Sequence, residues 1–178
     1  MLAKLKEQRI AIFIDVQNLY HSAKNFYQTK VNFREILKTA IAGRKLIRAF
    51  AYVIATEEGI ELDFFDALEK QGIEIRSKDL QIFSGGSKKG DWDVGMAIDA
   101  VRLSSKLDTI ILITGDGDFI PLVEYLQFNA GCQVEVMTFG KSASTKLTES
   151  CDEFFDLDKN PRKYLMGAPA RKISARKK

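Results

Sequence analysis

The sequence is poor in the residues that build soft-metal and thiol sites. Its 178 residues include one histidine, His21, and two cysteines, Cys132 and Cys151. A single imidazole excludes a metal site made from several histidines, and we expect His21 to be an ordinary helix residue. The cysteines lie far apart and form no CxxC pair, so we predict free thiols in a protein of the reducing cytoplasm.

Long apolar runs and several catalytic signatures are missing as well. No apolar run approaches the roughly 20 residues that a membrane helix needs, and residues 1–9 are polar and charged, unlike a secretory signal. The chain has no GxxxxGK[ST] phosphate loop, no GxGxxG after its first apolar run and no GxSxG nucleophile turn. We therefore expect neither a membrane protein, nor a P-loop or dinucleotide-binding enzyme, nor a serine hydrolase of that type.

Charge is distributed unevenly along the chain. Eight of the 27 basic residues fall in residues 159–178, which contain no acidic residue, and the preceding chain keeps 19 basic against 24 acidic residues. We predict a domain over residues 1–158 and a basic, flexible tail over residues 159–178. Such a tail could contact a polyanion, or it could simply keep the protein in solution.

Apolar runs alternate with segments of helical period. Strands are predicted at residues 9–14, 46–55, 73–77, 109–113, 133–139 and 154–157, with helices between them that include one at about 62–72. Because this alternation is typical of βαβ units, we predict an α/β fold, a three-layer sandwich around a mostly parallel sheet of about five or six strands. The third and last strands are expected near the sheet edges, and the last is a place where a homodimer could form.

Four aspartates are predicted to meet where the parallel strands end. Asp15 ends the first strand, Asp116 and Asp118 follow the fourth, and Asp93 opens a helix. Two carboxylates 4 Å apart repel by roughly 4 kcal/mol at an effective dielectric near 20, so a bound cation is favoured. A site of oxygen ligands without histidine or cysteine suits Mg²⁺ or Mn²⁺. Asn18 could orient a ligating carboxylate or a metal-bound water.

Simpler structural roles compete at these positions. An aspartate between a strand and a helix is often only an N-cap, which is an equal alternative for Asp15 and the favoured role for Asp91. Capping explains only one carboxylate of the pair after the fourth strand. Asp99 lies six residues after Asp93, about 600° around the helix, and so faces elsewhere.

Three nearby residues have weaker predicted roles. Thr114 could donate a hydrogen bond to a ligating carboxylate. Trp92 could stack on nucleic-acid bases, whereas Phe119 is predicted to pack in the core. A phosphatase with an aspartyl nucleophile would resemble this layout, but it would have a second aspartate two residues after Asp15, where this chain has Gln17.

Three motifs together resemble the NYN domain, in particular its LabA-like branch. They occur in the family's order and are Phe13-Ile-Asp-Val-Gln-Asn-Leu-Tyr20, Lys89-Gly-Asp-Trp-Asp-Val94 and Thr114-Gly-Asp-Gly-Asp-Phe-Ile-Pro-Leu-Val123. The similarity covers roughly residues 8–158. It implies the Rossmann-like fold of the PIN-like nucleases and a metal-dependent endoribonuclease whose acidic residues bind Mg²⁺ or Mn²⁺.

The resemblance also implies roles for individual residues. The positions that match the family's acidic residues and its asparagine are Asp15, Asp93, Asp116, Asp118 and Asn18, and Asp99 matches a further recurrent aspartate. Two departures stand out. The Asp91-Trp92 pair precedes Asp93 where the family more often has a small or apolar residue, so either Asp91 or Asp93 could be the ligand. Thr114 replaces the commoner serine and keeps the hydroxyl.

The leading hypothesis is hydrolysis of phosphodiester bonds in single-stranded RNA. The residues predicted to contact the nucleic acid are Lys88, Lys89, Trp92, Arg171 and Lys172. Two alternatives stay open at this point: a regulatory RNA-binding module that cleaves slowly or not at all, and a metal-dependent phosphatase that acts on small phosphomonoesters.

Overall fold

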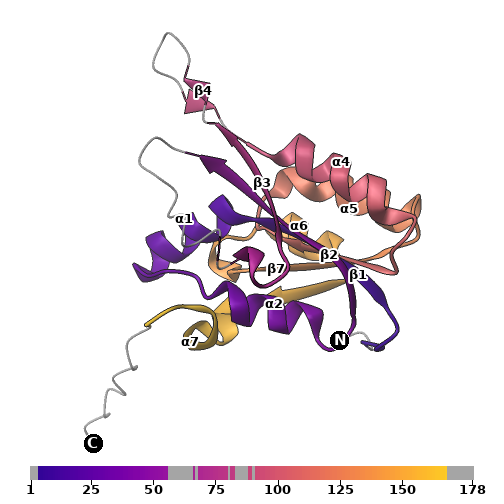
Figure 1. Cartoon of the computed structure of the whole chain (residues 1–178), viewed down its shortest axis with the longest axis horizontal. Helices are drawn as coiled ribbons and strands as arrows, with labels where there is room; N and C mark the ends of the chain where they lie inside the picture. Colours follow the sequence, from indigo (N-terminus) through magenta and orange to yellow (C-terminus); the bar gives the residue numbers. More distant parts are fainter. Residues whose placement is uncertain are drawn as a thin grey trace, which may run out of the picture.

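The computed structural model describes residues 4–55, 66, 68–79, 81–82, 88–89 and 91–167. Within these residues, six parallel strands form one sheet with helices on both of its faces (Figure 1). The predicted α/β class and the strand number are therefore confirmed. Part of the predicted helix at 62–72 lies outside the described residues, and so do residues 168–178 of the predicted tail.

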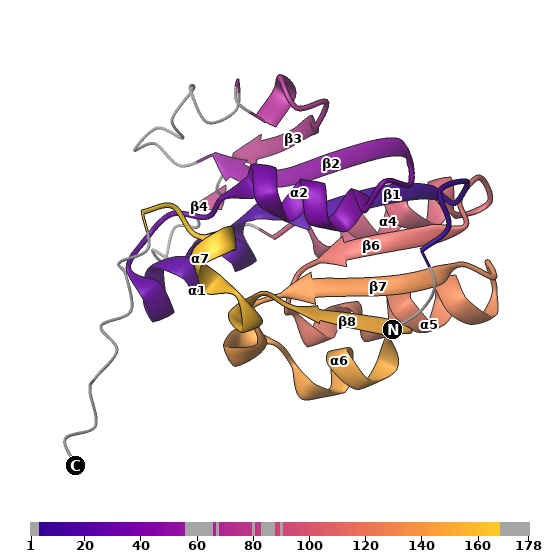
Figure 2. The ribbon, with the colours of Figure 1, turned by 90° about the horizontal axis from the view of Figure 1, so that it is seen from below.

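The sheet has the strand order β3-β2-β1-β6-β7-β8, and every neighbouring pair is parallel. The bounds of its strands are β1 Arg9–Asp15, β2 Lys45–Ala55, β3 Glu74–Asp79, β6 Thr109–Ile113, β7 Gln133–Thr138 and β8 Glu153–Asp156. The direction of strand addition reverses between β1 and β6, which lie side by side at the centre (Figure 2). In such sheets the crevice at the carboxyl ends of these two strands is the usual ligand site.

Two sets of helices cover the two faces. One face carries α1 (Val16–Tyr27), α2 (Phe33–Ile41) and α7 (Pro161–Tyr164), and the other carries α4 (Asp93–Ser104), α5 (Ile120–Phe128) and α6 (Thr145–Ser150). The 3₁₀ turns are η1 (Gly117–Phe119), η2 (Gly140–Ser142) and η3 (Leu157–Lys159), and a separate antiparallel pair joins β4 (Gln81–Ile82) to β5 (Lys88–Lys89).

The central strand β6 shows why an unbroken apolar run predicts this fold. All five of its residues are buried; Ile111 and Ile113 pack on the α1–α2 side, and Ile110 and Leu112 pack on the α4–α5 side. Successive side chains of a strand point to opposite faces, so a strand covered on both faces needs apolar residues throughout. Phe119 is only 2% exposed, which confirms its predicted place in the core.

The edge predictions are confirmed, since β3 and β8 are the outermost strands. The predicted cap of α4 is wrong. This helix begins at Asp93 and its N-cap position is Trp92, with no side-chain hydrogen bond to the cap. The Trp92 carbonyl already accepts from the Met96 N–H at 2.7 Å. Asp91 therefore lies one residue too early to cap the helix.

The described chain stays packed on the domain beyond the predicted boundary at residue 159. Tyr164 and Leu165 are each 3% exposed, and Leu165 forms an isolated antiparallel bridge with Val31. The Asn32 N–H donates to the Tyr164 carbonyl at 2.8 Å. Residues 164 and 165 therefore pack against the domain, which the basic composition of this stretch did not indicate. In the part of the chain that the structure describes, every helix is too short or too polar to cross a bilayer.

Candidate functional site

The first polar group of the site is the carboxylate of Asp15, at the end of β1. Asp15 is also the N-cap of α1, because its Oδ1 accepts from the Asn18 N–H at 3.0 Å. Its Oδ2 accepts from the Thr114 hydroxyl at 3.1 Å, just beyond the end of β6. The capping role of Asp15 is therefore present, and it occupies only one of the two carboxylate oxygens.

Thr114 and Asn18 connect the ends of the two central strands. The Thr114 hydroxyl donates to Asp15 and accepts from the Asp116 N–H at 3.2 Å. The Asn18 Oδ1 accepts from the Gly115 N–H at 2.9 Å. The predicted hydrogen bond from Thr114 to an aspartate is thus present. The Asn18 side chain holds the backbone that follows β6, while its own N–H holds Asp15.

Asp116 and Asp118 lie on the single turn that leads into α5. Asp116 caps η1, with its Oδ1 accepting from the Asp118 N–H at 2.9 Å. The turn is packed closely at Gly115, where a Cβ atom would lie 3.0 Å from the Ser142 carbonyl oxygen and 3.2 Å from the Cα of Ala143. A residue without a side chain lets the segment after β7 pack against the turn and hold it in place.

Asp93 reaches the same rim from the start of α4 and completes an acidic group. One carboxylate oxygen from each of Asp93, Asp116 and Asp118 lies within 4.8 Å of the other two, and no other such acidic group occurs in the described part of the chain. Two oxygens on opposite sides of a Mg²⁺ ion would be about 4.2 Å apart, given Mg–O distances near 2.1 Å. Small side-chain rotations would therefore bring all three onto one hard cation, and an oxygen-only donor set fits that ion.

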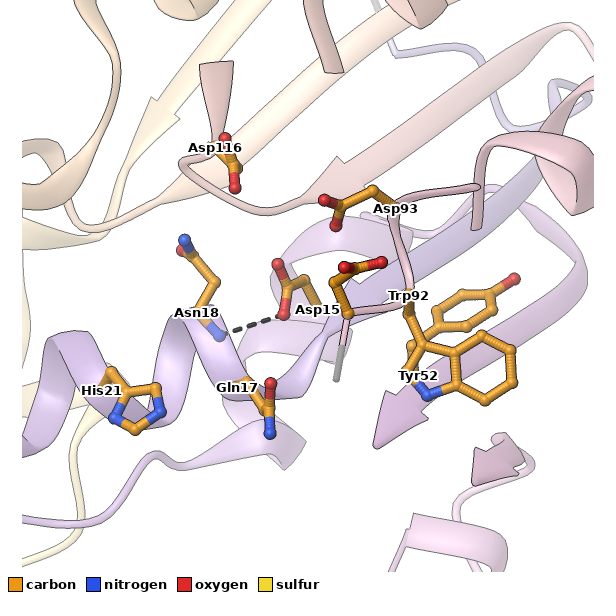
Figure 3. A pocket seen from close by; sticks show the side chains of 9 residues that line it. Asp15, Gln17, Asn18, His21, Tyr52, Trp92, Asp93 and Asp116 are labelled. Carbon is orange, nitrogen blue, oxygen red and sulfur yellow. Dashed lines mark hydrogen bonds between the residues drawn. The ribbon is translucent and has the colours of Figure 1, made fainter. Parts of the chain in front are cut away.

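A cavity of about 210 Å³ opens beside this group. Its lining residues are Asp15, Gln17, Asn18, His21, Tyr52, Asp91, Trp92, Asp93 and Asp116. Figure 3 shows Asp15, Asp93 and Asp116 around a common space, although they come from three separate segments of the chain. Asp118 is exposed and lies outside the lining. Asp93 and Asp116 therefore belong both to the cavity and to the group of three close carboxylates.

The crowding of carboxylates changes the proton affinity of the site. Partial burial, followed by repulsion from Asp91, Asp116 and other nearby carboxylates, raises the pKa of Asp93 to about 6. Burial also raises the pKa of Asp15, against the opposing effect of the hydrogen bonds from Asn18 and Thr114. Among the described residues that line the cavity, none is a lysine or an arginine. The lining residues that the structure describes therefore do not neutralise the negative charge of this rim.

Tyr52 is a wall of the cavity that the sequence did not single out. It lies within the apolar strand β2, in register with Asp15, and its hydroxyl donates to Asp99 Oδ2 at 3.1 Å. Burial and the nearby Asp99 charge raise the pKa of Tyr52. Asp99 thus holds Tyr52 and is not one of the three close carboxylates. Only the register between β1 and β2 could have indicated Tyr52.

The structure describes the side chains of only some of the residues that are predicted to contact nucleic acid. Trp92 lines the cavity, and its indole N–H donates to the Val53 carbonyl at 2.7 Å. Lys88 and Lys89 form β5, but their side chains lie outside what the structure describes. Arg171 and Lys172 lie outside the described residues altogether. The exposed His21 also lines the cavity, a position that its predicted role as an ordinary helix residue did not include.

Comparison with known protein families matches residues 9–158 to the NYN domain, from the start of β1 into η3. The chain belongs to the NYN domain family. This assignment places it among the PIN-like nucleases, and it confirms the family that the three sequence motifs indicated.

Individual relatives of this NYN protein agree with the assignment. It is 28% identical to the "Low amplitude and bright protein LabA" of Synechococcus elongatus over 165 residues, which cover 86% of each chain. It is 30% identical over 164 residues to an uncharacterized protein of Methanocaldococcus jannaschii, and it spans 59% of that protein's length. A crystal structure of a protein of unknown function from Vibrio parahaemolyticus matches 93% of this chain and all of its own, with a TM-score of 0.82 and 31% identity.

Proposed function

We propose that this NYN protein is a metal-dependent endoribonuclease that hydrolyses phosphodiester bonds in single-stranded RNA. The observation that carries the proposal is the convergence of Asp93, Asp116 and Asp118, whose carboxylate oxygens lie within 4.8 Å of one another at the switch point of the sheet. Unneutralised carboxylates this close oppose one another, so the arrangement is favourable mainly when a cation is present. The family assignment supports the choice of nucleic acid as the substrate.

Mg²⁺ or Mn²⁺ would be held by Asp93, Asp116 and Asp118, and Asp15 lines the same cavity. When bound, such an ion binds phosphate oxygens, lowers the pKa of an attacking water and stabilises the leaving oxygen. Asp15 and Thr114 act on the same site by fixing the backbone of Asp116 through the Thr114 hydroxyl. Asn18 fixes the preceding residue, so the turn is organised before a ligand arrives.

Gln17 argues against a phosphatase with an aspartyl nucleophile. It lines the cavity two residues after Asp15, where an aspartyl-nucleophile phosphatase would need a carboxylic acid to protonate the leaving group. An amide cannot donate a proton in that way. The arrangement instead suits a reaction in which the leaving oxygen is stabilised electrostatically.

The test is cleavage of an end-labelled single-stranded RNA by the wild type and by Asp116→Asn, each with Mn²⁺, Mg²⁺ or chelator. We expect products only with metal and only from the wild type, because the substitution removes a charged ligand and keeps the side-chain volume. Glu124→Gln is the matched control, since it removes one negative charge from the exposed surface of α5, away from the cavity.

Equal cleavage by Asp116→Asn and the wild type would contradict the proposal and would point to a contaminating nuclease. Binding of RNA in chelator, without product under any metal condition, would favour the regulatory binding module. Faster turnover of a chromogenic phosphomonoester than of any oligonucleotide would favour the phosphatase.

A further inference from the structure

The edge strand β3 and its neighbour β2 carry three cations on the α4 side of the sheet. In the register between these strands, Phe50 pairs with Glu74, Tyr52 with Arg76 and Ile54 with Lys78. Because alternate side chains share a face, Arg76 and Lys78 lie on the same face as Phe50 and Tyr52, and so does Arg48. We call Arg48, Arg76 and Lys78 the basic ledge.

Aromatic rings position the three cations of the ledge. The Arg48 guanidinium lies 4.6 Å from the centre of the Phe50 ring, and that of Arg76 lies 5.3 Å from the same ring. The Lys78 ammonium lies 4.8 Å from the centre of the Trp92 ring. Cation–π contacts at these distances hold a charged group over a ring face while leaving its N–H groups available to other acceptors.

The ledge is open to solvent and its cations are only partly neutralised. The Arg48 and Arg76 side chains are 39% and 43% exposed. Arg48 forms a close ion pair with Glu74, whereas Arg76 meets Asp99 at a longer 3.6 Å. Among the residues that the structure describes, Lys78 has no carboxylate partner.

Trp92 connects the ledge to the acidic cavity. One side of its indole carries the Lys78 ammonium, and its N–H is fixed on the Val53 carbonyl. The ring also lies over the first turn of α4, where a Cβ on Gly95 would come within 2.6 Å of it. Trp92 lines the cavity and precedes Asp93 directly (Figure 3). Lys78 therefore lies next to the wall of the cavity, and Arg76 and Arg48 lead away from it along the sheet edge.

We infer that the basic ledge binds the phosphates of one nucleic-acid strand on one side of the bond placed at the acidic group. This inference rests on the proposed function, because it extends the same substrate from the cavity onto the edge of the sheet. Phosphates carry the negative charge that complements the ledge. Without the ledge, the acidic cavity would repel them. A row of three cations provides a track for one backbone, whereas a duplex presents two.

The spacing of the ledge agrees with this use. Alternate residues of a strand are about 6.7 Å apart, which is comparable to the separation of neighbouring phosphates in an extended single strand. Lys78 is the residue we expect to contribute most, because none of the carboxylates that the structure describes is paired with it. Arg76 comes next, because its ion pair with Asp99 is long.

The test measures binding of a fluorescent 12-nucleotide single-stranded RNA by anisotropy at several salt concentrations. The full chain carries Asp116→Asn to prevent cleavage, with or without Arg76→Gln/Lys78→Gln. The matched control is Arg34→Gln/Lys106→Gln, which removes two positive charges from exposed positions, one on α2 on the opposite face of the sheet and one just after α4. The single variant Lys78→Arg keeps the positive charge at this position of the ledge, so it should bind RNA like the parent.

We expect the ledge variant to bind about tenfold more weakly at low salt, and its salt slope to fall by about 1.4, since each lost contact to a single strand removes about 0.7. The control should keep the parent's affinity and slope. If ledge and control variants bind alike, or if the parent binds no RNA, the inference is overturned. A loss confined to duplex RNA would overturn it as well.

The outcome is separable from that of the proposed function. If the wild type does not cleave RNA and the ledge variant still binds RNA more weakly than its parent, the nuclease proposal fails and the ledge inference stands. If the wild type cleaves in a manner that depends on Asp116 and the ledge variant binds RNA like the control variant, only the ledge inference fails. Thermal unfolding of each variant checks that its fold is retained.

Discussion

Carboxylates at the two ends of the sheet have different surroundings. Those at the amino end are paired with arginines, whereas those at the carboxyl end lie close to one another. At the amino end, Glu135 is 6% exposed and accepts hydrogen bonds from both terminal nitrogens of the buried Arg44, at 2.6 and 2.9 Å. Asp108 is paired there with Arg9, whose hydrogen bonds lower the pKa of Asp108 to about 2. At the carboxyl end, repulsion and burial instead raise the pKa of Asp93 to about 6.

This difference separates carboxylates that support the fold from carboxylates that could serve a ligand. A buried charge with a fixed partner is strongly destabilising only when the partner is removed. A group of carboxylates without a partner lowers the stability of the free protein and becomes favourable when a cation binds. The two ends should therefore respond to substitution with opposite signs.

The largest effect is expected at the buried pair of the amino end. Arg44→Met should lower the free energy of unfolding by about 3–5 kcal/mol, because it leaves Glu135 charged and buried, with the Lys4 ammonium at 3.3 Å as its remaining ion-pair partner among the described residues. Urea unfolding at pH 7 measures the change. The double variant Arg44→Met/Glu135→Met should recover a large part of the loss, and a double variant as unstable as the two single changes combined would contradict this account.

The next effect concerns the gain in stability from metal at the carboxyl end. Mn²⁺ at 100 times its dissociation constant should raise the free energy of unfolding of the wild type by about 2.7 kcal/mol, because the ion binds only the folded chain. Asp116→Asn should show little or no gain. Thermal unfolding with and without Mn²⁺ tests this, and Glu124→Gln should respond like the wild type. An equal gain in all three proteins would place the ion elsewhere.

A smaller effect of opposite sign is expected without metal. Asp93 has a pKa near 3.9 in an unfolded chain and about 6 in the folded protein. Because the folded pKa is the higher one, its contribution to stability is complete below pH 4 and is lost as the pH rises through 6. Asp93→Asn should therefore match the wild type at pH 4 and exceed it by about 0.5–1 kcal/mol at pH 8, a figure reduced because solvent screens a partly exposed group.

Urea unfolding in chelator at pH 4, 5, 6 and 8 measures how this difference in stability grows with pH. Glu124→Gln again provides the control and should run parallel to the wild type at every pH. If Asp93→Asn were less stable than the wild type at pH 8, the carboxylate would be supporting the fold, and the contrast between the two ends would disappear.

The smallest effect is expected at the exposed pair of the amino end. The Arg9 and Asp108 side chains are 48% and 39% exposed, so solvent screens their attraction. Asp108→Asn should lower the urea midpoint slightly at low salt, and the difference should vanish in 1 M NaCl. It should also shrink as the pH falls from about 4 toward 2, because the lowered pKa means that the wild type loses this contribution as Asp108 is protonated. A loss that persists in high salt would show that Asp108 acts through its hydrogen bond to the backbone.

The parts of the molecule that follow local rules could be predicted from the sequence. The run at 109–113 is apolar on both faces of a strand, so it indicated a central position in a parallel sheet. The aspartates at the ends of β1 and β6 were predictable for the same reason, because parallel strands end at one rim. Which three of the four aspartates bring their carboxylates close together depends on side-chain directions, which the sequence does not specify.

The errors arose where the backbone or distant contacts decide the outcome. Asp91 and Trp92 both precede the helix, and only the backbone hydrogen bond from Met96 places the cap at Trp92. The packing of residues 161–165 was not foreseen because residues 161–164 look like a basic tail, and composition does not reveal the contact of Leu165 with Val31. Tyr52 and the basic ledge could be identified only from the register between neighbouring strands.

The bonds that join Asn18 to Gly115 and Asp15 to Thr114 span 97 and 99 positions of the chain. Contacts of this separation form only after both halves of the sheet have docked, since closing so long a loop has an entropic cost that local contacts do not offset. During synthesis, residues 1–113 could already collapse into a partial sheet, but the acidic group would still be incomplete. Any activity of this rim is therefore withheld from the growing chain until the turn after β6 has been made and folded.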